Sequence, residues 1–235
     1  MKKQILIIGY ANGLKGVKSD LDNYYRFFRS PMGGGWYEDE ICILPHTTSA
    51  QVMKYIDYFC RMRLDYFIFV FCGHGASMRD EVVMQVNNTD PFIREKDILN
   101  VAPRQLSIFD CCRERESDDS FASLTEMRLF SSGGQIRGNA RQRYEQRIMQ
   151  AVPQSACLYA CSVGECADGN NSGGLYSYSL LKAARNIVGE TDYKTVGRCH
   201  YEACQQLEAK NAAQHPDYKL PRCLVNRSLI LSIHP

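Results

Sequence analysis

The chain has 235 residues, of which 45% are hydrophobic, so it can bury the core of one large α/β domain. Its formal net charge is only +2, which disfavours nucleic-acid binding and binding to a charged membrane surface. The longest apolar run is far shorter than the roughly 20 residues that a membrane-spanning helix needs.

The first part of the chain alternates between short apolar runs and amphipathic segments. Runs rich in β-branched and aromatic residues that end at glycine are typical of buried parallel strands. The expected elements are a strand at Gln4–Gly9, a helix at about Val17–Phe28, a strand at Glu40–Leu44, a helix at Ser49–Met62 and a strand at Tyr66–Cys72. This alternation predicts a doubly wound, mostly parallel central sheet flanked by helices.

The second part continues less regularly. The expected elements are a hairpin strand at Glu81–Val86, a short helix at Arg94–Leu99, a strand at Leu106–Asp110, a helix at Gln142–Val152, a strand at Ala156–Cys161, helices at Leu175–Val188 and Asp192–Lys210, and short strands at Leu220–Asn226 and Leu229–Ile233. A polar segment at about 113–143 contains Ser131-Ser132-Gly133-Gly134 and predicts a long loop. No repeat or linker is visible, so residues 1–235 are expected to form a single domain.

Eleven cysteines are a large number for this length. Several lie within apolar strand or helix patterns, which is typical of reduced core thiols and predicts a cytoplasmic protein. A zinc site would have to be built around Cys157, Cys161, Cys166 and Cys199-His200, but the chain has no Cys-x-x-Cys pair, which structural zinc sites usually show. No metal site and no cofactor are therefore expected.

Two of the expected strands end in residues suited to nucleophilic catalysis. His74 lies between two glycines after one strand, and Cys111 and Cys112 follow Asp110 at the end of the next long strand. In open α/β sheets, active sites gather at the carboxyl ends of the strands. A thiol beside an imidazole is sufficient for covalent acyl transfer. Because neighbouring residues of a strand point to opposite faces, only one of the two cysteines can meet His74.

These residues resemble the caspase-like cysteine peptidases, the clan of caspases, paracaspases and metacaspases. Gly73-His74-Gly75 and Asp110-Cys111-Cys112-Arg113 are closer to metacaspases and their bacterial relatives than to caspases. The resemblance extends over nearly the whole chain, through Lys3 to Gly9, Leu14 to Asp22 and Ala160 to Leu181. It implies a caspase-like fold and a cysteine endopeptidase that acts on proteins or peptides.

The resemblance also implies the catalytic roles. Cys112, directly before Arg113, matches the nucleophile, and His74 matches the general acid for the leaving amine. The backbone N–H groups of Gly75 and Cys112 would form the oxyanion hole.

A substrate pocket follows from the same resemblance. Metacaspase-like enzymes bind a substrate Arg or Lys through two carboxylates, which Asp20 and Asp110 match in this chain. Cys72 matches a position that lines this pocket. Two converging acids favour a cation and repel an anion, so cleavage after Arg or Lys is predicted.

Other interpretations stay open at this stage. Asp20 is equally compatible with a residue in the solvated first turn of a helix, and Lys15 and Lys18 are close enough to neutralise it. Glu114 stands where relatives often have Gly or Ser, which leaves a catalytically silent caspase-like binding or scaffold domain in a signalling or defence pathway as the alternative. Nucleotide binding is disfavoured, because no Gly-x-Gly-x-x-Gly follows the first strand.

The segment after the nucleophile carries two further hypotheses. Many metacaspases are activated by calcium, and Asp118-Asp119 is a candidate site, with a solvated loop as the alternative. Residues 115–143 include several arginines, so an enzyme specific for basic residues could process itself there.

Overall fold

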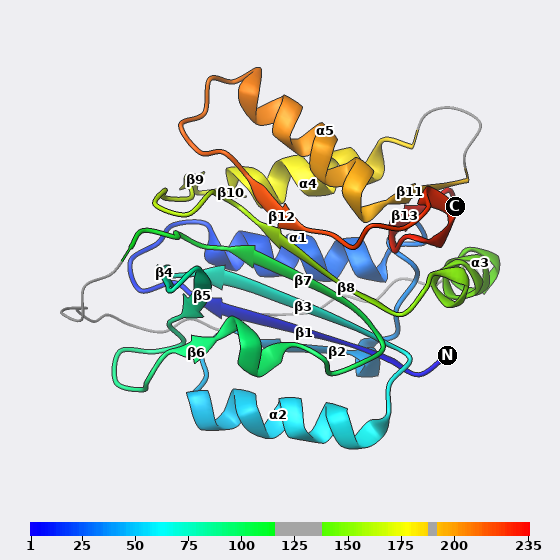
Figure 1. Cartoon of the computed structure of the whole chain (residues 1–235), viewed down its shortest axis with the longest axis horizontal. Helices are drawn as coiled ribbons and strands as arrows, with labels where there is room; N and C mark the ends of the chain where they lie inside the picture. The colour runs from blue at the N-terminus through cyan, green and yellow to red at the C-terminus, as the bar shows by residue number, and fades with distance from the viewer. Residues whose placement is uncertain (116–137, 188–191) are drawn as a thin grey trace.

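A computed structural model describes residues 1–115, 138–187 and 192–235. The chain folds around a six-stranded sheet in the order β12-β8-β7-β3-β1-β2 (Figure 1). The strands are β1 (Lys3–Tyr10), β2 (Ile41–Leu44), β3 (Tyr66–Gly73), β7 (Arg104–Asp110), β8 (Gln154–Tyr159) and β12 (Asp217–Lys219). Strands β2, β1, β3, β7 and β8 are parallel, whereas β12 runs antiparallel to β8 at the edge. The mostly parallel sheet predicted from the sequence is confirmed.

Helices cover both faces of this sheet (Figure 1). Helix α2 (Ser49–Met62) packs on one face, and α1 (Val17–Arg29), α4 (Leu175–Arg185) and α5 (Val196–Glu208) lie on the other. Alternate residues of β3 supply the two cores: Ile68 and Val70 pack on the α1 side, and Phe69 packs on the α2 side. The α3 helix (Gly138–Gln150) adds Tyr144 to the α1 core. This is the doubly wound arrangement that the alternation predicts.

The bounds of α2 are those predicted. The helix begins after Thr48, whose hydroxyl accepts the backbone N–H of Gln51 at 3.1 Å. Such an N-cap stabilises a helix by about 1 kcal/mol. It ends where Arg63 adopts a left-handed conformation with φ of 52°.

Smaller elements lie at both ends of the sheet (Figure 1). The strands β4 (Gly75–Met78), β5 (Glu81–Met84) and β6 (Ile93–Arg94) form a three-stranded antiparallel sheet directly after β3. Two further antiparallel pairs join β9 (Gly169–Asn170) to β10 (Gly173–Gly174) and β11 (Tyr193–Thr195) to β13 (Ile230–Ile233). Short 3-10 turns are η1 (Glu38–Glu40), η2 (Glu95–Ile98) and η3 (Val225–Arg227).

Several predicted bounds in the second part were wrong. The strand expected at Leu220–Asn226 is instead β12 at Asp217–Lys219, because Pro221 has no N–H with which to continue the ladder. Helix α5 begins at Val196 rather than Asp192, because Thr195 caps it while the residues before it pair with β13. Strand β8 starts and ends two residues earlier than expected.

The end of the segment that was expected to be a long loop is helical. Helix α3 begins at Gly138 and takes up the end of the segment expected at 113–143. Residues 116–137, with the candidate calcium site Asp118-Asp119, lie outside the described residues. In the ranges that the structure describes, no helix is long and apolar enough to cross a membrane.

Candidate active site

A cavity of 560 Å³ opens where β3 and β7 end. These strands are neighbours, with Cys72 opposite Asp110, so the segments that follow them leave the sheet at the same edge. The cavity is lined by residues that the sequence singled out: Asp20, His74, Gly75, Asp110 and Cys112. Cys72 is buried beside Asp20 and Asp110 and does not belong to the lining.

His74 is positioned by the backbone around it. The preceding Gly73 has a φ of +154°, and a Cβ there would lie 2.6 Å from the carbonyl oxygen of Tyr10. The His74 Nε2 atom lies 3.0 Å from the carbonyl oxygen of Asn12. Since a carbonyl can only accept, this contact puts the ring proton on Nε2 and the lone pair on Nδ1. The Asn12 carbonyl could not be predicted as a partner of His74, because any residue can supply a backbone carbonyl.

The structure distinguishes the two adjacent cysteines. Cys111 is 2% exposed and packs in the core on the α2 side, directly beneath Gly75. Burial, with Cys161 and Asp110 nearby, raises the pKa of the Cys111 thiol well above its usual value. Cys112 is half-buried and lines the cavity. Cys111 also borders this cavity, but because its side chain is buried in the core, Cys112 is the more accessible of the two adjacent cysteines.

Contacts of the Arg113 side chain hold the backbone next to Cys112 in place. Its buried guanidinium donates from Nη1 to the carbonyl of Cys161 at 3.1 Å and to the carboxylate of Asp217 at 2.9 Å. The same group stacks on the ring of Tyr159, 4.1 Å from its centroid. A planar cation held on three sides restricts the movement of the residue before it.

The hydrogen-bond pattern of β4 orients the N–H of Gly75. Gln85 N–H donates to the His74 carbonyl at 3.0 Å, and Gly75 stands opposite Met84 in the next position of this antiparallel pair. N–H groups alternate between the two sides of such a strand, so those of Gly75 and Ser77 both point away from β5. Ser77 N–H does reach the Glu114 carbonyl, at 2.9 Å. The Gly75 N–H therefore points toward the segment that carries Cys112.

Two buried carboxylates form the floor of the cavity. Asp20 and Asp110 are 4% and 7% exposed. The Gly174 N–H donates to both oxygens of Asp20, at 3.1 and 2.9 Å, and the Ser177 N–H donates to Asp110 Oδ2 at 3.1 Å. These N–H groups belong to the start of α4, where the helix dipole favours negative charge.

The close approach of the carboxylates to α4 requires glycine. At Gly173, with a φ of +126°, a Cβ would lie 2.2 Å from an oxygen of Asp20. At Gly174 a Cβ would lie 2.4 Å from an oxygen of Asp110. The adjacent glycines in the sequence were a signal for this site that sequence reasoning missed.

Asp20 and Asp110 are both buried, and burial disfavours the charged form of a carboxyl group. Burial, followed by repulsion from Asp110, raises the pKa of Asp20 to about 8, against the opposing hydrogen bond from Gly174. Burial also raises the pKa of Asp110. At neutral pH the pair retains a proton, and a cation entering the cavity could replace it.

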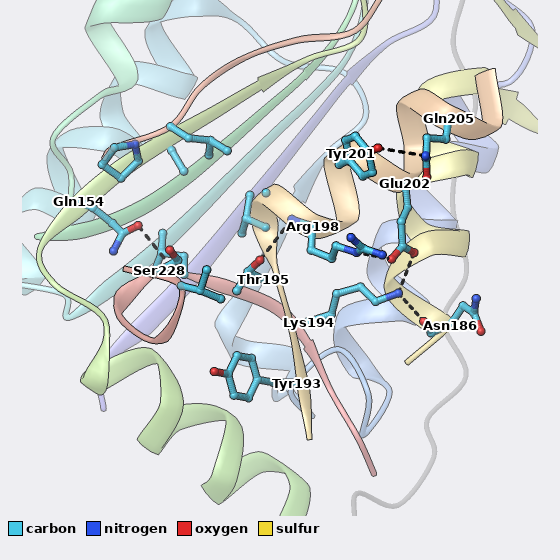
Figure 2. A pocket seen from close by; sticks show the side chains of 17 residues that line it. Gln154, Asn186, Tyr193, Lys194, Thr195, Arg198, Tyr201, Glu202, Gln205 and Ser228 are labelled. Carbon is cyan, nitrogen blue, oxygen red and sulfur yellow. Dashed lines mark hydrogen bonds and ion pairs between the residues drawn. The ribbon is translucent and has the colours of Figure 1, made fainter. Parts of the chain in front are cut away.

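A larger cavity of 1010 Å³ lies apart from this site, beside β11 and α5 (Figure 2). Its charged groups neutralise one another: Lys194 and Arg198 each contact the carboxylate of Glu202 at 2.8 Å. None of the candidate catalytic residues lines it. Across the described parts of the chain, no group of three or more His, Cys, Asp or Glu side chains could hold a metal ion.

Comparison with known proteins identifies the family and the fold of the chain. The Caspase domain family matches residues 2–223 of the sequence. Among solved structures, caspase-1 from Spodoptera frugiperda has a similar fold, with a TM-score of 0.60 at 13% identity over 93% of this chain and 86% of that chain. No curated protein matches the sequence. With nearly its whole length matched and the fold shared, the chain belongs to the caspase-domain family of peptidases.

Proposed function

We propose that this chain is a cysteine endopeptidase that uses His74 and Cys112 and cleaves after Arg or Lys. The observation that carries the proposal is the cavity that His74 and Cys112 share with two buried carboxylates, Asp20 and Asp110. A buried pair of acids interacts favourably with a guanidinium or ammonium group and unfavourably with a carboxylate.

The proposed reaction assigns one step to each of these groups. The Cys112 thiolate attacks the scissile carbonyl carbon, and the N–H groups of Gly75 and Cys112 stabilise the oxyanion. His74 takes the proton of the Cys112 thiol on Nδ1, because Nε2 is engaged with the Asn12 carbonyl, and it then passes this proton to the leaving amine. Water hydrolyses the resulting thioester and regenerates the thiol.

The proposal includes a metacaspase-like subtype and a cytoplasmic setting. The acid pair and the Asp-Cys-Cys-Arg sequence favour the metacaspase-like subtype over an aspartate-specific caspase. All eleven cysteines are free thiols, which supports a reducing compartment. Calcium activation through Asp118-Asp119 stays a hypothesis about residues outside the described ranges.

Matched fluorogenic peptides that differ only in the residue before the scissile bond test this function. Arg and Lys peptides should be cleaved at least about 100-fold faster than the Asp peptide, since burying the wrong charge costs several kcal/mol. Cys112→Ala is the inactive control. Faster cleavage after Asp would contradict the specificity. No cleavage at all, with no labelling of Cys112 by a thiol-directed peptidyl inhibitor, would favour the catalytically silent alternative.

A further inference from the structure

A second thiol stands at the wall of the catalytic cavity. Cys166 is exposed, lies in the segment between β8 and β9, and lines the same cavity as Cys112. The proposed peptidase reaction makes no use of it.

The backbone places the two cysteines opposite each other. Arg113 N–H donates to the Glu165 carbonyl at 2.8 Å, and Gly164 N–H donates to the Arg113 carbonyl at 2.8 Å. Gly164 has a φ of +93°, so it and Glu165 form a glycine β-bulge facing Arg113. The next pair along, Cys112 and Cys166, faces across without its own backbone hydrogen bonds.

That position suits a disulfide. In an antiparallel pair without mutual hydrogen bonds, the Cα atoms lie about 4.5 Å apart and the side chains are close. Disulfides are found at Cα separations of about 4.4–6.8 Å. Cys112 and Glu114 lie close enough to the Cys166 thiol to affect its ionisation. Partial burial and these two neighbours raise the pKa of the Cys166 thiol, so it is protonated at rest.

We propose that Cys166 is a resolving thiol, which forms a reversible disulfide with Cys112 after oxidation by a hydroperoxide. This inference rests on the proposed function only in making Cys112 the reactive thiol. Its consequence is a peptidase that peroxide switches off and a dithiol reductant switches on again. Disulfides in reducing compartments are typically of this transient kind.

The chemistry balances in two steps. The Cys112 thiolate attacks one peroxide oxygen, the O–O bond breaks, and Cys112 becomes a sulfenic acid while hydroxide or an alkoxide leaves and takes a proton from the solvent. The Cys166 sulfur then attacks the Cys112 sulfur, the S–O bond breaks, and water leaves as the S–S bond forms.

Glu114 has a role in the second step. Its carboxylate lies near the Cys166 thiol and accepts the thiol proton as that sulfur attacks. The loss of negative charge on Cys112 upon oxidation removes one of the groups that hold Cys166 protonated. The acidic residue where relatives have Gly or Ser thus gains a function.

Peroxide treatment followed by alkylation and non-reducing peptide mapping tests the proposal. Wild-type protein should lose two hydrogen masses and yield a peptide cross-linked between Cys112 and Cys166. Dithiothreitol should then restore nearly the full untreated rate. In Cys166→Ala, Cys112 should instead gain two or three oxygen atoms, and less than about a tenth of that variant's own untreated rate should return. Glu114→Gln should form the cross-link more slowly.

Cys60→Ala, which removes an exposed thiol on α2, is the matched control and should behave as wild type. A cross-link from Cys112 to Cys111 or Cys161, no cross-link, or full recovery of Cys166→Ala would overturn the proposal. Because mapping needs no peptidase activity, a cross-link in a protein that cleaves nothing would refute the proposed function and leave the disulfide standing.

Discussion

The acid pair makes a quantitative prediction about stability. Asp20→Asn keeps the size of the side chain and an oxygen for the Gly174 N–H, but it removes the ionisable group. The pKa of Asp20 is about 8 in the folded chain and near 3.8 without the fold. The folded state therefore binds a proton more tightly than the unfolded state over this interval. The stability that this proton contributes is greatest at low pH and is lost as the pH rises through the folded value.

The size of the change in stability follows from the difference between the folded and unfolded pKa values of Asp20. While folded Asp20 is protonated and unfolded Asp20 is ionised, the free energy of unfolding falls by about 1.4 kcal/mol per pH unit. Between pH 4.5 and 7.5 the accumulated loss is at most about 4 kcal/mol, because Asp110 shares the proton with Asp20. Asp20→Asn lacks this loss, so it should be more stable than wild type at pH 7.5 and close to wild type at pH 4.5.

Urea unfolding of both proteins across this pH range measures the difference. The single tryptophan, Trp36, is completely buried in the α1 core, so its fluorescence reports unfolding. Titrating groups elsewhere affect both proteins alike and cancel in the difference. Unfolding free energies that stay parallel within about 0.5 kcal/mol from pH 4.5 to 7.5 would refute the protonated acid pair.

Three other predictions concern the site and its surroundings. Cys112→Ala should abolish peptide cleavage whereas Cys111→Ala keeps part of it, as measured with an Arg peptide; the reverse result would move the nucleophile by one residue. Gly173→Ala should cost at least about 2 kcal/mol in urea unfolding, because its Cβ would strike Asp20, whereas Gly13→Ala, with nothing within 4 Å, should cost less. Intact-mass analysis should find fragments ending at arginines of residues 115–143 in wild type and not in Cys112→Ala; a single full-length mass in an active wild type would contradict self-processing.

Local signals predicted the first part of the fold well. Residues that are close together in the sequence determine the cap and apolar spacing of α2. The same holds for the apolar runs of β1 and β3 that lead up to a glycine. The last strand was harder, since β12 is only three residues long and is defined by pairing with β8. Its residues form a strand because of a distant partner, which no local pattern contains.

In the candidate site too, some features could be predicted from the sequence and others could not. Side chains such as His74 and Cys112 were identifiable because their residue types carry chemistry. The Asn12 carbonyl and the N–H groups of α4 were not, since every residue has a backbone. The identity of the buried cysteine followed only when the α2-side core was seen to enclose Cys111.

The contact between Arg113 and Asp217 has a consequence for when, during synthesis, the candidate site can form. Asp217 is separated from Arg113 by 104 residues, and Gly174 from Asp20 by 154. Contacts of such sequence separation carry a large loop-closure cost and form late. A chain still leaving the ribosome would expose Cys112 well before Asp217 exists to hold its neighbour or α4 exists to organise the acids. The proposed peptidase activity therefore has to wait until α4 and Asp217 have been synthesised, which delays it without an inhibitor.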